Sequence, residues 1–97
     1  MPTSVSHSMS RTRNYHQETI GTIGRFFEVL DILVEERKIK SINSFCEHYA
    51  IDKRNLYAQR EDVRRGYFEV AWVTFLVRDY KASARYLLLG KGKMFSA

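Results

Sequence analysis

A helical stripe of apolar residues constrains the fold of this chain more than any other feature. The stripe occupies successive offsets of 0, 3, 4, 7, 10 and 11 and comprises Ile23, Phe26, Phe27, Leu30, Leu33 and Val34. This spacing places the side chains on one face of an α-helix. The sequence predicts an amphipathic helix that begins near residues 21–22 and ends within residues 35–38, where basic residues suit its negative end.

Two capping residues predict a pair of short helices after this one. Ser41 has the side chain of an N-cap for a helix whose apolar face carries Ile42, Phe45, Cys46 and Tyr49. Asp52 is suited to cap the next helix, which runs from Lys53 to about Glu61. The inward positions of that helix are Leu56 and Gln59. Residues 41–61 therefore predict two helices joined by a turn of three residues.

The last third of the chain predicts two more helices. An apolar stripe around Trp72, Phe75 and Leu76 indicates a helix over about 69–80. Ser83 can cap a final helix through residue 89, and Gly90 suits a left-handed stop after it. The chain shows no convincing β alternation and no hairpin dipeptide. We expect an all-α fold, a compact bundle of about five helices that contains a helix-turn-helix.

Chain length and polarity predict the domain organisation. The 97 residues match one domain and leave no room for two full ones, which excludes large catalytic folds. Residues 1–20 are polar and show no apolar period, so we expect a flexible N-terminal arm there. The folded domain is expected to span residues 21–97.

The inventory of reactive residues argues against several classes of protein. Cys46 is the single cysteine, so no intramolecular disulfide can form and a reducing compartment is expected. No signal-peptide profile and no apolar run of about 20 residues is present, which predicts a cytoplasmic protein with no membrane partner. The histidines and cysteine lack zinc-ligand spacing, and no catalytic constellation was found. We expect neither an enzyme nor a cofactor.

Basic residues are concentrated around the two predicted short helices. The whole chain holds 16 basic and 11 acidic residues, a formal net charge of +5. Residues 37–60 hold six basic and two acidic residues, a net charge of +4 in under a quarter of the length. Such an excess suits an anionic partner.

The outward residues of the helix at about 53–61 are of the types that read DNA bases. Arginine and lysine pair with guanine O6 and N7, and asparagine pairs with adenine N6 and N7. The predicted base contacts are Lys53, Arg54, Asn55 and Tyr57. The predicted phosphate contacts are Lys40, Ser41, Asn43, Ser44 and Arg60, because helix N-termini and cations bind phosphates. The alternatives for these residues are a solvated helix start, plain capping and, for Tyr57, a core position.

Three segments resemble a known family. They are residues 25–30, residues 41–52 and residues 83–95, the last of which is similar to the family's SAEWLLTGxGxMF ending. The chain resembles the lambda-repressor-like helix-turn-helix domains, of the phage-repressor type common in Bacteroidetes and their phages. The resemblance covers roughly residues 22–95. It implies a five-helix domain whose third helix enters the major groove of double-stranded DNA, usually as a dimer on a palindromic operator.

The chain departs from that family at two turns. Ala50 and Lys81 stand where the family usually has glycine. A non-glycine residue in the left-handed conformation costs roughly 1 kcal/mol, so each turn either is reshaped or carries this cost, and the sequence leaves both alternatives open. A reshaped turn at Ala50 would tilt the helix that follows.

The leading functional hypothesis is a small repressor-like transcriptional regulator in a bacterial or infected-host cytoplasm. The alternative is a protein-interaction module, such as a phage accessory or assembly protein, that keeps the fold without reading DNA. The aromatics Trp72, Phe75 and Tyr86 are interpreted first as core, and second as a homodimer face on the last two helices.

Overall fold

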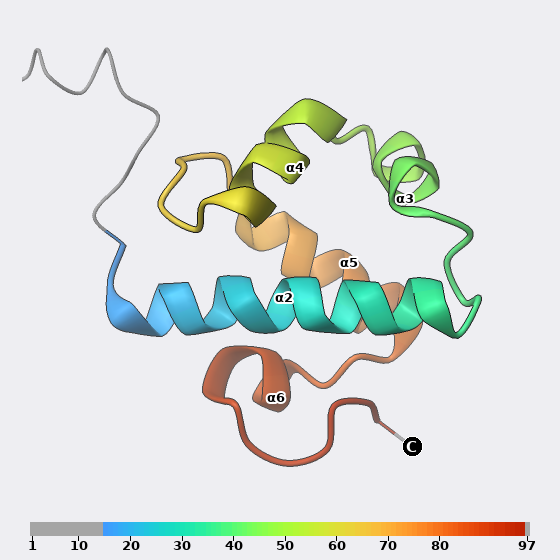
Figure 1. Ribbon diagram of the computed structural model, residues 1–97. Helices are drawn as coiled ribbons and strands as arrows, with labels where there is room; N and C mark the ends of the chain where they lie inside the picture. The colour runs from blue at the N-terminus through green and yellow to red at the C-terminus, as the bar shows by residue number, and fades with distance from the viewer. Residues whose placement is uncertain (1–14, 97) are drawn as a thin grey trace, which may run out of the picture.

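The computed structural model describes residues 15–96, and within this range the chain forms five α-helices (Figure 1). They are α2 (Gln17–Glu35), α3 (Ile42–Tyr49), α4 (Lys53–Glu61), α5 (Val70–Tyr80) and α6 (Ala84–Leu89). An antiparallel β-bridge joins Ala82 and Phe95. The predicted all-α bundle of about five helices is confirmed.

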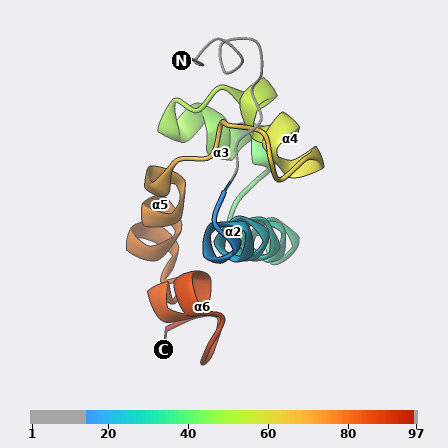
Figure 2. The same cartoon turned by 90° about the vertical axis from the view of Figure 1, so that its left-hand side faces the viewer.

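Helix α2 runs through the middle of the bundle, and the other helices surround it. In Figures 1 and 2, α3 and α4 lie on one side of α2 and α6 lies on the opposite side. Helix α5 packs beside α2 and leads from the α4 side to the α6 side. The long stripe predicted from the sequence is the buried face of α2, with Phe26, Val29 and Leu30 fully enclosed.

An aromatic cluster around Phe26 joins α2 to three other segments. The Phe26 ring centroid lies 6.3 Å from that of Phe45 in α3 and 5.8 Å from that of Trp72 in α5. It lies 5.9 Å from the ring of Phe68, in the connection that precedes α5. Offset and edge-to-face aromatic pairs at these distances add to the energy of burial. The core is therefore centred on the middle of α2.

Helix α2 starts earlier than the sequence predicted. It begins at Gln17, after an N-cap at His16 whose Nδ1 accepts a hydrogen bond from the Glu18 backbone at 3.1 Å. Histidine is not among the usual capping residues, and the first turn is polar and mostly exposed, so no apolar period marks it.

The predicted N-terminal arm was therefore too long. Residues 17–20 are helical, and Tyr15 packs against the core while its hydroxyl donates to the Arg65 carbonyl oxygen at 3.0 Å. The rest of the predicted arm, residues 1–14, lies outside the described residues.

The predicted helix caps are confirmed. Ser41 Oγ accepts from the Ser44 backbone N–H at 3.0 Å, and Asp52 Oδ1 accepts from the Arg54 N–H at 2.9 Å. Ser83 Oγ likewise accepts a backbone N–H at the start of α6. Each bond satisfies a donor that the first helical turn leaves without an intrahelical partner.

The two turns that lack the family's glycine keep the left-handed conformation. Ala50 has φ 56° and ψ 41° after α3, and Lys81 has φ 62° and ψ 24° after α5. Of the two alternatives, the turns are therefore not reshaped, and both residues carry the conformational strain. The left-handed conformation of Ala50, which glycine would adopt more easily, therefore sets the direction in which α4 follows α3.

Gln59 is a fully buried polar residue that binds the connection between α4 and α5. Its Nε2 donates to the Val63 carbonyl oxygen at 2.7 Å. Its Oε1 accepts from the backbone N–H groups of Tyr67 and Phe68 at 2.9 and 3.1 Å. One side chain thereby satisfies three backbone groups of an irregular segment.

Replacing Ala50 by glycine should stabilise the protein. Glycine removes the left-handed penalty, part of which is offset by its greater freedom in the unfolded chain, so we expect a gain of about 0.5–1 kcal/mol in the free energy of unfolding. Urea denaturation measures this free energy. Ala58→Gly, inside α4, is the matched control and should lose about 1 kcal/mol. A loss at Ala50 like that of the control would contradict the strained turn.

Replacing Gln59 by leucine should destabilise the fold strongly. The change leaves one backbone carbonyl and two backbone N–H groups without their partner, at about 1–3 kcal/mol for each group that stays buried. We expect a loss of at least about 2 kcal/mol in urea denaturation. Gln17→Leu at the exposed start of α2 should change the free energy by less than about 0.5 kcal/mol. Equal changes in the free energy of unfolding for Gln59→Leu and Gln17→Leu would show that the Gln59 hydrogen bonds contribute nothing to stability.

Candidate nucleic-acid interface

A shallow groove follows the exposed face of α4. It is lined by Asn43, Lys53, Arg54, Tyr57, Ala58 and Glu61. Lys53, Tyr57 and Glu61 are spaced four residues apart on α4, so they share one helix face. The opposite face is buried through Leu56 and Gln59. The amphipathic pattern of α4 therefore aims these side chains away from the core, and we call this the α4 surface.

Tyr57 links the α4 surface to the start of α3. Its side chain is 40% exposed, which excludes the core position considered as an alternative. Its hydroxyl donates a hydrogen bond to Asn43 Oδ1 at 3.2 Å. The bond uses the amide oxygen of Asn43 and leaves its NH₂ group as a donor. Two residues predicted for different kinds of contact are thus neighbours on one surface.

Of the predicted phosphate contacts, Asn43 lines this groove, whereas Lys40 lines a separate cleft with Glu35 and Lys38 at the connection between α2 and α3. Lys40 is exposed and directly precedes the Ser41 cap, while Ser41 and Ser44 are half-buried. The N-terminal end of α3 carries partial positive charge from the aligned peptide dipoles.

Asn55 does not join the other predicted base-contacting residues. It is half-buried and lines a separate cleft together with Asp52, Tyr49 and Glu69. It lies on the side of α4 that faces the connection to α5. The structure therefore brings Lys53, Arg54 and Tyr57 together and places Asn55 apart from them.

Arg60 forms an intramolecular ion pair. Its Nη2 donates to Asp31 Oδ1 of α2 at 2.6 Å, and its guanidinium carbon lies 5.6 Å from the centre of the Phe27 ring. A phosphate contact by Arg60 would require this ion pair to open. Asp31 is 29 positions away in sequence, so the local charge pattern gave no sign of the pairing.

Glu61 is a member of the α4 surface that was not among the predicted site residues. Its carboxylate adds an acceptor beside Lys53 and Arg54, and carboxylates can accept from cytosine N4. The signal was available, because Glu61 follows Lys53 and Tyr57 at helical spacing.

The far end of α3 is held to α5 by a polar cluster. The Tyr49 hydroxyl donates to Asp79 Oδ2 at 2.6 Å, and Arg78 Nε donates to Asp79 Oδ1 at 2.9 Å. The Tyr49 ring stacks on Phe75 with centroids 4.1 Å apart. Bonds from Arg78 and then Tyr49 hold the pKa of the Asp79 carboxyl well below its usual range. Burial and the bond to Asp79 raise the pKa of Tyr49.

The aromatics suggested as a homodimer face are used within the chain. Trp72 is buried, and Phe75 is covered by its stack with Tyr49. The Tyr86 hydroxyl donates to Glu28 of α2. The structure therefore supports the core interpretation of these residues and gives no support to a dimer face built from them.

Searches for other sites give two negative findings for the described residues. Between residues 15 and 96, no helix is long and apolar enough to cross a membrane. The same residues hold no group of three or more histidine, cysteine or acidic side chains arranged for a metal ion.

Comparisons with protein-family models, with curated proteins and with solved structures give no match to this chain.

The Asp79 cluster predicts a pH dependence of stability. The folded-state pKa of Asp79 is depressed, so its contribution is present above the unfolded pKa of about 4 and is lost as the pH falls below it. We expect Asp79→Asn to show a smaller loss of unfolding free energy than the wild type between about pH 5 and pH 2. Tyr49→Phe removes one of the three hydrogen bonds to the Asp79 carboxylate, so its loss of unfolding free energy should lie between those of the other two proteins. Identical pH profiles for all three proteins would contradict this role of Asp79.

Proposed function

We propose that this protein binds double-stranded DNA, with α3, the turn at Ala50 and α4 acting as a helix-turn-helix. The observation that carries the proposal is the α4 surface, where Lys53, Arg54 and Tyr57 share an exposed groove with the first turn of α3. A major groove about 12 Å wide admits an α-helix presented in this way. The family resemblance of the sequence favours the same function.

The side chains of the α4 surface and of the start of α3 are suited to two kinds of contact, with DNA bases and with phosphates. Arg54 and Lys53 are suited to guanine O6 and N7, and the methyl of Ala58 is suited to the thymine methyl group. Lys40, Ser41, Ser44 and the amide of Asn43 would hold the backbone on the α3 side. Asn55 and Arg60 have secondary parts in this proposal, because one lies in a separate cleft and the other is paired with Asp31.

A DNA-binding protein of this size would act by occupying its site. Bound at an operator, it would block polymerase sterically, which makes it a repressor-like regulator. The competing hypothesis, a protein-interaction module without a DNA role, differs in its response to salt. Duplex binding driven by phosphate contacts weakens with a slope of about −0.9 in log affinity against log salt for each phosphate neutralised.

Fluorescence anisotropy on random duplex DNA across a salt series tests the proposal. We expect binding at low salt that weakens steeply, and Lys40→Ala should reduce the slope by about 1. Lys93→Ala, on the α6 side, is the matched control and should leave the slope within error. Absence of binding at low salt, or a flat salt response, would favour the interaction module.

Arg54→Ala tests base reading on a duplex selected by the wild-type protein. The loss of a bidentate guanine contact should weaken binding by about 1–3 kcal/mol and relax the preference at one position. Glu18→Ala, exposed at the start of α2, is the matched control and should bind as the wild type does. Unchanged affinity of Arg54→Ala would remove Arg54 from the proposed contacts.

A further inference from the structure

A second concentration of positive charge follows Asp79. From residue 80 to the end the sequence has no acidic residue and four basic ones, Lys81, Arg85, Lys91 and Lys93. Their net charge of +4 equals that of residues 37–60, so the rest of the chain carries −3 of the total of +5. Residues 61–79, between the two basic regions, hold four acidic and three basic residues, a net charge of −1.

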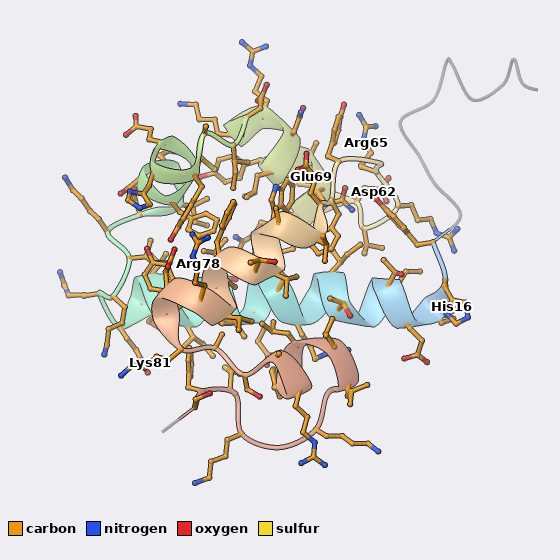
Figure 3. The ribbon with its side chains drawn as sticks, turned by 180° about the vertical axis from the view of Figure 1, so that it is seen from behind. His16, Asp62, Arg65, Glu69, Arg78 and Lys81 are labelled. Carbon is orange, nitrogen blue, oxygen red and sulfur yellow. The ribbon has the colours of Figure 1, made fainter. Side chains whose placement is uncertain are left out.

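The two basic regions meet at one cleft, which Lys38 and Lys81 both line, and continue from there into helices on different sides of α2. Helix α6 and the segment after it lie on the other side of α2 from α3 and α4 in both Figure 1 and Figure 2. Lys81, at the end of α5, points outward in Figure 3. A duplex held on the α4 surface would not cover α6.

Exposed leucines accompany the charge on α6. Leu88 and Leu89 are 47% and 61% exposed, and they follow Arg85 at positions i+3 and i+4 of the helix. The three side chains therefore share one face. Gly92 lies beside Arg85, where an added Cβ would be 3.9 Å from the Arg85 Cδ, so the loop with Lys91 and Lys93 adjoins this face. We call these five exposed residues the α6 surface, which comprises Arg85, Leu88, Leu89, Lys91 and Lys93.

The leucines are held in their exposed position by contacts on the inner side of α6. Arg25 of α2 donates from Nε to the Leu87 carbonyl oxygen at 2.9 Å and from Nη2 to the Leu88 carbonyl oxygen at 3.1 Å. Leu87 is fully buried, and Gly90 ends the helix in the left-handed conformation with φ 71°. The end of α6 is thus fixed, with Leu88 at the edge of a cleft that Thr19 of α2 and Val70 of α5 also line, and with Leu89 exposed beside it.

We propose that the α6 surface binds an acidic amphipathic segment of a partner protein. An amphipathic helix can place apolar side chains on Leu88 and Leu89 while its carboxylates meet the surrounding cations. Arg85 can bind a carboxylate through two parallel hydrogen bonds. The partner is specified by this complementarity of charge and apolar surface.

Other occupants fit the α6 surface less well. A symmetric pair of copies would bring the same +4 region to both sides of the contact, and like charges across an interface are costly. Duplex DNA would set two leucines against phosphates. Membrane-surface helices bury a long apolar face, whereas α6 has six residues and two exposed leucines.

A designed peptide tests the proposal on the full chain. The probe is a fluorescein-labelled amphipathic helix of glutamate and leucine, with leucines at i, i+3, i+4 and i+7, and the control peptide has the same composition in scrambled order. We expect the ordered peptide to bind more tightly than the scrambled one. The double variant Leu88→Ser/Leu89→Ser and the triple variant Arg85→Gln/Lys91→Gln/Lys93→Gln should each weaken its binding at least about tenfold, which is 1.4 kcal/mol.

Duplex binding and circular dichroism of the same proteins serve as controls. The two leucine substitutions leave the net charge of the protein unchanged and lie far from the α4 surface. The duplex affinity and the helix content of this variant should therefore match those of the wild type, whether or not the proposed DNA function holds. The proposal is overturned if the ordered peptide does not bind or binds no better than the scrambled one, or if the leucine variant binds it normally. It is also overturned if the leucine substitutions instead abolish self-association in sedimentation or binding to vesicles of phosphatidylglycerol and phosphatidylcholine.

Discussion

The packing of aromatic rings around Phe26 fixes how α3, the connection before α5 and α5 itself lie against α2. The ring is fully buried, and it is the point at which α2 meets Phe45 of α3, Phe68 of the connection and Trp72 of α5. A cavity there would loosen three segments together, because protein interiors close only partly around a lost ring. The start of α3, and through the turn the whole of α4, take their position from this cluster.

Polar contacts around that core then fix the orientation of the candidate interface. Tyr49 and Asp79 hold the end of α3 to α5, Arg60 and Asp31 hold α4 to α2, and Gln59 holds α4 to the connection that follows it. Asp62, Arg65 and Glu69 on that connection are seen in Figure 3 between α4 and α5. Sites held by packed helices and such supporting bonds are formed before a ligand arrives, which lowers the entropy lost on binding. The α4 surface is of this preformed kind.

Local patterns predicted most of the fold, and long-range contacts account for most of what they missed. The apolar period of α2 and the caps Ser41, Asp52 and Ser83 depend on residues within a few positions, so the sequence could show them. The Arg60–Asp31 pair and the inward side of Asn55 depend on how α4 sits against α2 and the connection, which no local pattern encodes. The early start of α2 was missed because His16 is an unusual cap on a polar first turn.

We propose two interaction surfaces for this molecule, the α4 surface and the α6 surface, which lie on opposite sides of α2. The central proposal concerns the first of them. Selection of binding sites from random duplex DNA with the full chain tests it most directly, because enrichment reports both affinity and base reading. We predict recovery of a shared motif that includes guanine and is lost when Arg54 is replaced by alanine. Recovery of unrelated sequences at every salt concentration, with no motif in common, would contradict DNA reading by α4.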